Sequence, residues 1–379
     1  MGYLPSFGSI ARVVGGVLVV SLISTAGLLY RYQTSLIYPS SFPSGSKAEV
    51  STPDEYDLPY TEEELITPDS QTLRVFVMLQ GTALAKSNEK SLQRKSSPTQ
   101  TGKAPLEVTD AALAGKRPTV LFLHANAGNM GHRLPLAAVF FKRFGCNVVM
   151  LSYRGYGFST GSPNERGIKI DTQTTLDYIR SHPALSSTLL VAYGQSIGGA
   201  VAIDLAARNP ASVHALILEN TFLSIPELIP HVLPPVRPFA FLCREYWNSA
   251  EAICKVAAKV PVLFLSGRQD ELVPPAHMDA LYAACNSTTK RFQRFAQGTH
   301  NDTCIQQGYF ETIGEFLLAH VVTLVNERTA APKQSGSSEE KLVWREASGD
   351  EDEWVQMSHS ELRGTTDPDA PTLSKAPKL

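Results

Sequence analysis

Three polar side chains in the second half of the chain can together perform acyl transfer. A serine hydroxyl is a weak nucleophile at neutral pH, so it needs a histidine to accept its proton and a carboxylate to hold that histidine's tautomer. Ser196, Asp270 and His300 occur in the chain order serine, acid, histidine, which is one of the orders in which such triads are found. We predict that they are nucleophile, orienting acid and general base.

The predicted nucleophile lies in the pattern Gly194-Gln195-Ser196-Ile197-Gly198. The apolar residues 189–192 before it are typical of a buried strand, and the small residues from Gly199 onward are typical of a helix start. Strand, sharp turn and helix is the context that Gly-x-Ser-x-Gly requires, because glycines permit a tight turn that leaves the hydroxyl exposed. The stretch predicts a nucleophile elbow.

Three carboxylates compete for the role of the acid. Asp270 follows the predicted strand at 260–265 and its loop immediately precedes the strand that leads to His300. Glu271 is adjacent but would point elsewhere, and Glu219 ends an earlier predicted strand, a position from which some hydrolases supply the acid. The position of its loop favours Asp270.

Two other histidines compete less well for the role of the base. His124 precedes the nucleophile, and His277 lies early in a predicted helix, where a packed or solvated histidine is the ordinary finding. His300 follows a predicted strand at 291–295, which is where the base is needed.

Acyl transfer also develops an oxyanion, which two preorganised backbone donors usually stabilise. One predicted donor is the amide of Ile197, directly after the nucleophile. The other is the amide of Asn126, in the loop 123–129 after the first central strand.

Regular alternation of apolar runs and helix-length segments indicates how these residues are positioned. Such alternation is the signature of an α/β fold whose mostly parallel central sheet carries helices on both faces, and ligands then bind at the carboxyl ends of the strands. A predicted antiparallel hairpin, formed by 64–67 and 73–79, opens the domain. The central apolar runs follow it at 120–123, 148–151, 189–192, 216–218, 260–265 and 291–295.

The amino-terminal region predicts a membrane anchor. Residues 13–30 carry no charge, Arg12 and Arg31 bracket them, and Tyr30 and Tyr32 occupy positions typical of interfacial aromatics. We expect one transmembrane helix at 13–30 after a short segment at 1–12. A cleaved signal peptide is the alternative, and the flanking charges leave both orientations open.

Composition divides the rest of the chain. Residues 36–326 form the predicted catalytic domain, in which the polar stretch 85–118 is a predicted disordered insertion and the polar, acidic stretch 327–379 a predicted disordered tail.

The stretch 222–250 interrupts the alternation with prolines and bulky apolar residues. We call it the cap segment and predict that it covers the active site; packing on the core without substrate contact is the alternative. Its predicted substrate contacts are Phe222, Leu223, Leu228 and Val232.

Charge and cysteine usage exclude several classes of function. The 34 Lys and Arg against 36 Asp and Glu give a net charge of −2, which does not favour nucleic acid as a partner. The five cysteines are scattered without CxxC spacing, so they suggest neither a zinc site nor a disulfide framework. We expect no metal and no cofactor.

Six motifs carry a resemblance, at 36–39, 124–129, 152–159, 193–199, 219–222 and 298–302. Together they resemble one family, the membrane-anchored serine hydrolases of the fungal bud-emergence type, and the chain is similar to the animal α/β-hydrolase-domain protein thirteen. The resemblance implies an α/β-hydrolase fold and a single-pass protein of the endoplasmic reticulum or plasma membrane that cleaves an ester or thioester. At one position the chain departs from the family, which usually has glycine where this chain has Ala125, and the added Cβ predicts a changed oxyanion loop.

The leading hypothesis is a membrane-anchored serine hydrolase that acts on acyl esters or thioesters of lipids or S-acyl proteins. One alternative is a morphogenesis scaffold that retains the fold for binding. The other is a serine peptidase of the same fold, which differs in the leaving group.

Overall fold

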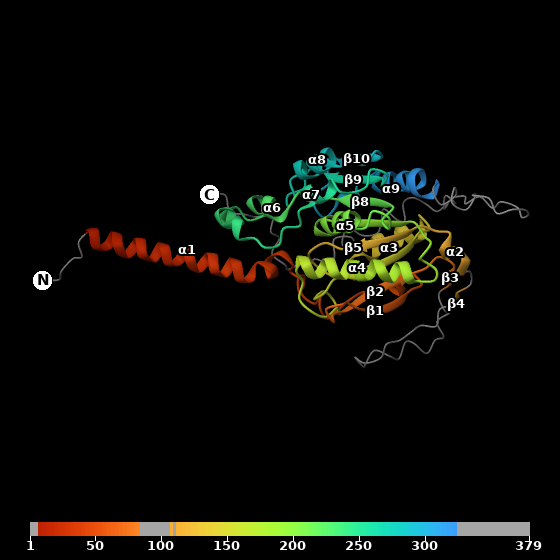
Figure 1. Ribbon diagram of the computed structural model, residues 1–379, viewed down its shortest axis with the longest axis horizontal. Coiled ribbons are helices and arrows are strands. Elements are labelled where there is room, and N and C mark those ends of the chain that lie inside the picture. The colour runs from red at the N-terminus through yellow and green to blue at the C-terminus, as the bar shows by residue number, and fades with distance from the viewer. Residues whose placement is uncertain (1–6, 84–106, 109–110, 324–379) are drawn as a thin grey trace, which may run out of the picture.

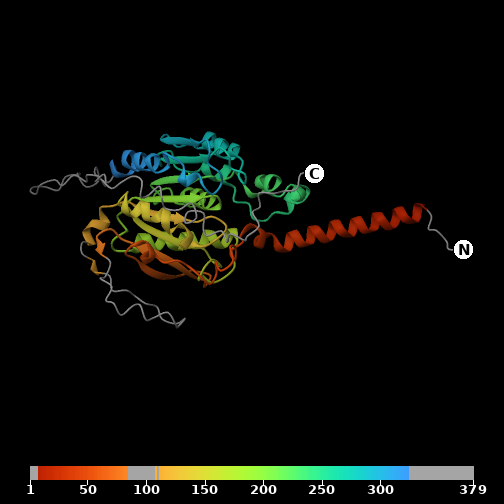
Figure 2. The same cartoon turned by 180° about the vertical axis from the view of Figure 1, so that it is seen from behind.

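The computed structural model describes residues 7–83, 107–108 and 111–323. A long helix, α1 (Phe7–Ile37), projects from one end of an α/β domain (Figure 1). The carboxyl-terminal helix α9 (Tyr309–Leu317) lies at the opposite end of that domain (Figure 2).

An eight-stranded sheet forms the centre of the domain. β1 pairs antiparallel with β2, β2 pairs antiparallel with β6, and all the other neighbours are parallel. The predicted hairpin and the predicted mostly parallel sheet are confirmed. In sheet order the strands are β1 Thr61–Ile66, β2 Thr72–Met78, β6 Asn147–Ser152, β5 Thr119–Leu123, β7 Leu190–Gln195, β8 Ala215–Glu219, β9 Val262–Gly267 and β10 Lys290–Phe295.

Helices cover both faces of this sheet, because successive side chains along each buried strand point to opposite faces. On β5, Leu121 packs in one core cluster while Val120 and Phe122 pack in the other. The first cluster includes residues of α4 (Glu165–Ser181), α5 (Ile197–Arg208), α7 (Ser249–Ile253) and α8 (Pro275–Ala284). The second includes residues of α3 (Leu134–Lys142) and α9.

Helix α1 is longer than the predicted anchor. It contains a candidate membrane span, Val14–Ile37, whose 24 residues measure about 36 Å at about 1.5 Å each. The flanking arginines do not end the helix, which stops at Ile37, just before Tyr38-Pro39, because the residue that precedes proline disfavours the helical region.

The end of the predicted disordered insertion 85–118 is ordered, which corrects that prediction. β3 (Thr82–Ala83) pairs with β4 (Glu107–Val108), and a short helix, α2 (Ala111–Gly115), follows. Asn147 Nδ2 donates to the Ala114 carbonyl at 2.9 Å, so a buried polar contact holds α2 against the sheet. Residues 84–106 and the predicted tail 327–379 lie outside the described residues.

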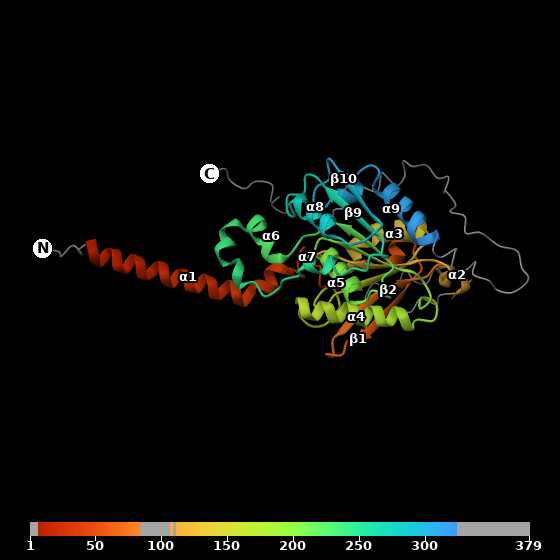
Figure 3. The same cartoon turned by 45° about the horizontal axis from the view of Figure 1, so that its top comes forward.

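The cap segment forms α6 (Ile225–Val232), the 3-10 stretch η4 (Pro234–Leu242) and then α7. Figures 1 and 3 show α6 and η4 beside the end of α1, away from the sheet. Four shorter elements complete the described chain: η1 Pro53–Tyr56, η3 Met130–Arg133, η5 Thr303–Ile305 and η6 Leu318–Val322.

Candidate active site

Ser196 occupies a strained turn between β7 and α5. Its φ of 56° and ψ of −123° lie in a region that side chains rarely adopt. A Cβ on Gly198 would lie 2.0 Å from the Leu123 carbonyl oxygen, and one on Gly194 would lie 2.1 Å from the Gly198 carbonyl oxygen. Both glycines are therefore required by close backbone approach, and α5 begins at Ile197.

Two hydrogen bonds fix the backbone of Ser196. Its N–H donates to the Glu219 carbonyl at 2.9 Å, and the hydroxyl of Thr221 donates to its carbonyl at 2.7 Å. Both partners lie at the carboxyl end of β8, so the neighbouring strand holds the turn in place and offsets its strain.

Asp270 and His300 lie side by side. Asp270 Oδ2 is 2.8 Å from His300 Nδ1, and both side chains are buried. The other carboxylate oxygen accepts the N–H groups of Leu272 at 2.9 Å and Val273 at 2.7 Å. Because the carboxylate accepts, Nδ1 of a neutral His300 carries the proton and Nε2 keeps its lone pair.

The two competing acids have other partners. Glu271 accepts the backbone N–H of His300 at 3.2 Å, so it holds the loop and not the imidazole ring. The side chain of Glu219 is fully buried and accepts the hydroxyls of Tyr193 and Tyr309. Burial raises the pKa of Glu219.

Two amide side chains that the sequence analysis does not single out tie the histidine loop to the sheet. Asn220 Nδ2 donates to the carbonyls of Thr299 and His300, both at 3.2 Å, while its Oδ1 accepts the Gly267 N–H at 2.8 Å. Gln195 Nε2 donates to the His300 carbonyl at 3.0 Å. In the sequence, the only sign of this role is that Asn220 directly follows the strand β8. In the structure, Asn220 has a φ of 44°, a conformation that asparagine adopts more readily than most residues.

The loop after β5 contains the predicted second oxyanion donor, Asn126. Its carbonyl accepts the hydroxyl of Tyr156 at 2.7 Å, and its Nδ2 donates to the carbonyl of Ile37, the last residue of α1, at 3.2 Å. Ala125 is not among the non-glycine residues with positive φ in the described chain. The loop therefore accommodates alanine without left-handed backbone.

His124, at the start of the same loop, forms hydrogen bonds that hold it in place. Its Nδ1 lies 2.7 Å from the Ala125 carbonyl, and the N–H of Tyr153 donates to its Nε2 at 3.4 Å. Burial lowers the pKa of His124 to about 3, so the ring is neutral at physiological pH. With Nε2 as acceptor, Nδ1 donates to the Ala125 carbonyl.

Comparison with known proteins identifies the family. The family model described as the alpha/beta hydrolase fold matches residues 118–238. Protein bem46 of Schizosaccharomyces pombe is 48% identical over 301 residues, which cover 79% of this chain and 90% of that protein. The chain belongs to the bud-emergence type of α/β hydrolase.

Two further matches agree with this assignment. The protein named uncharacterized membrane protein YNL320W of Saccharomyces cerevisiae is 38% identical to this α/β hydrolase over 305 residues, covering 80% of this chain and 95% of that protein. The solved structure of the Pyrococcus furiosus esterase Pf2001 superposes with a TM-score of 0.53 at 18% identity, covering 72% of this chain and 96% of that one. The second match shows a common fold.

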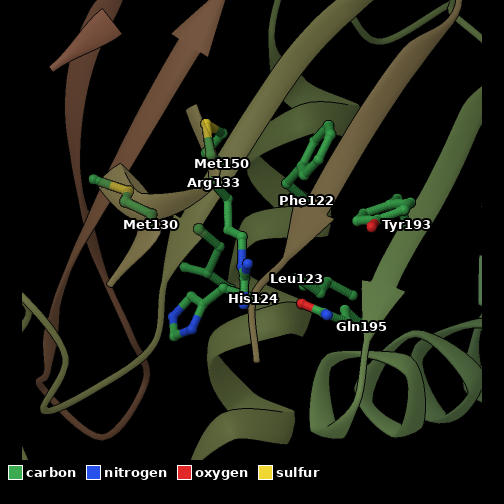
Figure 4. Close-up of a pocket in the computed structure, with 9 residues that line it drawn as sticks. Phe122, Leu123, His124, Met130, Arg133, Met150, Tyr193 and Gln195 are labelled. Atoms are coloured by element: carbon green, nitrogen blue, oxygen red, sulfur yellow. The ribbon is translucent and has the colours of Figure 1, made fainter. Parts of the chain in front are cut away.

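A cavity of about 10 Å³ lies under the β5 loop of this α/β hydrolase (Figure 4). Arg133, His124 and Gln195 point toward it, together with apolar side chains of β5 and β6. It has room for about one water molecule and none for an acyl chain. The cavity is therefore a small packing gap beneath the loop and is too small to be a substrate pocket.

The four predicted substrate contacts have different surroundings. Phe222 is buried in the core cluster that includes α5. Leu223 and Leu228 are partly buried against that cluster, and Val232 is exposed at the end of α6. His277 is buried and accepts the N–H of Leu223 at 3.2 Å, which fits a packed histidine.

Within the described residues, no group of three or more His, Cys, Asp or Glu side chains is placed to hold a metal ion. All five cysteines are free thiols.

Proposed function

We propose that this α/β hydrolase is a membrane-anchored serine hydrolase that cleaves acyl esters or thioesters with Ser196, His300 and Asp270. The observation that carries the proposal is the 2.8 Å contact between Asp270 Oδ2 and His300 Nδ1. Gln195, the residue before the strained Ser196, donates to the His300 carbonyl and so ties this pair to the strand-to-helix turn. This arrangement supplies a base of defined tautomer to a nucleophile held by its own backbone.

In the first half of the reaction, Ser196 Oγ attacks the acyl carbon while His300 Nε2 accepts the hydroxyl proton. The negative charge that develops on the carbonyl oxygen is stabilised by the amides of Ile197 and Asn126. The tetrahedral intermediate then collapses: the bond to the leaving oxygen or sulfur breaks, and His300 donates its proton to that atom. The product is an acyl ester of Ser196 and a free alcohol or thiol.

In the second half, water attacks the acyl carbon and His300 accepts its proton. The carboxylic acid leaves, and the proton returns to Ser196 Oγ. Asp270 keeps its hydrogen bond to His300 Nδ1 throughout and stabilises the imidazolium. These steps need no cofactor.

The proposed substrate class rests on the apolar composition of the cap segment and on the anchor. Leu223 and Leu228 lie in the cap segment, only a few residues after Thr221, whose hydroxyl holds the Ser196 carbonyl. Apolar side chains at this place suit an acyl chain. The apolar span Val14–Ile37 would keep the site near lipids and S-acyl proteins, and we propose a single-pass location in the endoplasmic reticulum or plasma membrane.

Fluorophosphonate labelling of the detergent-solubilised full-length protein tests the mechanism. We expect covalent labelling of the parent protein and its loss in Ser196→Ala. Ser181→Ala is the matched control, because Ser181 is an exposed serine at the end of α4, and it should label like the parent. An unlabelled parent, or full labelling of Ser196→Ala, would contradict the proposal.

Substrate class is tested separately with three probes that share one acyl chain and differ in the leaving group: an alcohol ester, an S-acyl cysteine peptide and an amide. We expect turnover of the ester and the thioester. Turnover of the amide alone would favour the peptidase alternative.

A further inference from the structure

The outer part of the cap segment exposes an apolar surface that the domain does not cover. Val232 is 42% exposed, Leu233 41% and Phe241 77%. No residue of η4, all of which the structure describes, is buried. In the stretch 225–243, Glu227 and Arg237 are the charged residues, and Arg237 is an exposed cation within η4, whose long side chain can reach the headgroups from an apolar surface. An exposed apolar surface of this kind marks an interaction site.

This surface adjoins α1. Gln33 Nε2 donates to the Leu242 carbonyl at 3.3 Å, and the N–H of Arg244 donates to Gln33 Oε1 at 2.6 Å. The guanidinium of Arg244 donates to the Tyr30 carbonyl at 3.0 Å and lies 4.3 Å from the Tyr30 ring centroid. The base of the cap segment is therefore fastened to the helix at Tyr30–Gln33.

The fastening point lies where the charge-free run of α1 ends. Tyrosine and arginine side chains prefer the membrane–water boundary, the aromatic ring at headgroup level and the cation toward water. Figures 1 and 3 both show α6 and η4 beside the carboxyl-terminal part of α1, at the end of the domain from which that helix projects. The exposed apolar side chains of the cap segment therefore belong to a segment that lies beside the apolar span of α1, away from the sheet (Figure 1).

We propose that the end of α6 and η4 insert into the bilayer leaflet that surrounds the carboxyl-terminal part of α1, with lipid acyl chains as the occupant of their apolar surface. The cap segment is then a second membrane contact beside the anchor. The proposal rests on α1 crossing the membrane. It does not depend on hydrolysis.

The consequence for the proposed function is that the catalytic site faces the bilayer. Asn126 Nδ2 donates to the carbonyl of Ile37, and the Gly128 N–H donates to the carbonyl of Phe42 at 2.7 Å, so the chain that leaves α1 packs on the oxyanion loop. If the cap segment inserts as proposed, the loop of Asn126 and the start of the cap segment both lie close to the bilayer, which would favour acyl chains presented from lipid.

Depth-dependent quenching tests the membrane contact in the full-length protein reconstituted into phosphatidylcholine vesicles with bromines at defined acyl-chain positions. Phe241→Trp is the probe. Val20→Trp, on the exposed face of α1, is the membrane-embedded control, and Leu318→Trp, exposed in η6 next to α9, is the aqueous control. The three native tryptophans are present in the parent, whose signal is subtracted.

We expect quenching of Phe241→Trp that approaches that of Val20→Trp and clearly exceeds that of Leu318→Trp. If Phe241→Trp is quenched no more than Leu318→Trp while Val20→Trp is quenched, the inference is overturned. If Val20→Trp is not quenched either, the anchor and the inference fail together. Because quenching requires no turnover, these results are independent of whether the protein is a hydrolase.

The functional consequence has its own test, which rests on the proposed function. Leu233→Asp combined with Phe241→Asp places two charges on the apolar surface, which disfavours its insertion. We expect hydrolysis of a long-chain ester in vesicles to fall by about tenfold or more, while hydrolysis of a water-soluble short-chain ester stays at the parent rate. If the parent and the double variant hydrolyse the vesicle substrate at equal rates, the inference that the site faces the bilayer is overturned. If the parent is inactive, the proposed function is overturned.

Discussion

The imidazole of His300 is held by Asp270 across two loops that follow neighbouring parallel strands, β9 and β10, with Nδ1 and Oδ2 2.8 Å apart. Asp270 is itself fixed by the N–H groups of Leu272 and Val273. The contact therefore sets the tautomer of the proposed base before any substrate arrives, and leaves Nε2 as the atom that would accept a proton.

Asp270→Asn should leave the fold intact and lower kcat for a soluble ester by about 10⁴, because an amide in place of the carboxylate favours the wrong tautomer of His300. The measurement is steady-state hydrolysis in detergent, with unfolding followed in parallel.

The matched control for this prediction is Asp279→Asn, which removes a carboxylate that binds Arg268 and Arg294 on the surface. It should retain activity within about twofold, since exposed pairs contribute little. Loss of activity in both variants, or in neither, would contradict the assignment of the acid.

Gly198→Ala should lower both the stability of the fold and the labelling of Ser196. An added Cβ would lie 2.0 Å from the Leu123 carbonyl oxygen, which is backbone and cannot rotate away, so β5 and α5 would have to separate. We expect a loss of about 3 kcal/mol or more in unfolding free energy, measured by urea titration. Gly115→Ala is the control, because its Cβ would meet neighbours at 3.8 Å or beyond, and a comparable loss there would refute the packing argument.

The sequence predicts those features that depend on local pattern. The elbow at Ser196 follows from an apolar run, two glycines and small helical residues that are adjacent in the chain. The strands of the sheet follow in the same way, because buried parallel strands are continuous apolar runs. The contact between Asp270 and His300 is predictable because the sheet brings the carboxyl ends of neighbouring strands together.

Features that depend on distant partners leave no such pattern. The hydrogen bonds of Asn220 to Thr299 and His300 join residues about eighty positions apart, and an asparagine after a strand has many other uses. The apolar composition of the cap segment is visible in the sequence. Its position beside α1 is not, because that position depends on the contact between Arg244 and Gln33, which are 211 residues apart. Helix α2 has only five residues, too few for a helical pattern in the sequence, and Asn147 on β6, which donates to the Ala114 carbonyl, is 33 positions from that residue.

Arg154→Met should destabilise the fold without touching the active site. The guanidinium donates to Asp171 at 2.9 Å and to Asp69 at 2.7 Å, and so joins α4 to the turn between β1 and β2. Hydrogen bonds from Arg154 hold the pKa of Asp69 well below its usual range, whereas burial raises that of Asp171. Removing the arginine leaves the buried Asp171 unpaired, at a cost of about 3–5 kcal/mol in unfolding free energy.

The matched control is Arg143→Met, which breaks an ion pair with Glu311 whose two side chains are about half exposed. It should cost less than about 1 kcal/mol. Both variants are measured by urea titration. Similar losses of unfolding free energy in the two variants would show that the buried ion pair of Arg154 contributes no more to stability than the exposed pair of Arg143.

His124→Gln should make stability less sensitive to acid. Burial lowers the pKa of His124 from its ordinary 6.5 to about 3, so between these values the unfolded chain binds a proton that the folded protein excludes. The contribution is fully present above pH 6.5 and is lost as pH falls toward 3, by about 1.4 kcal/mol per pH unit. We therefore expect the stability difference between parent and His124→Gln, measured by urea unfolding in detergent, to shrink by about 2 kcal/mol from pH 6.5 to pH 5. A difference that stays constant over this range would mean that His124 titrates alike in the folded and unfolded chain.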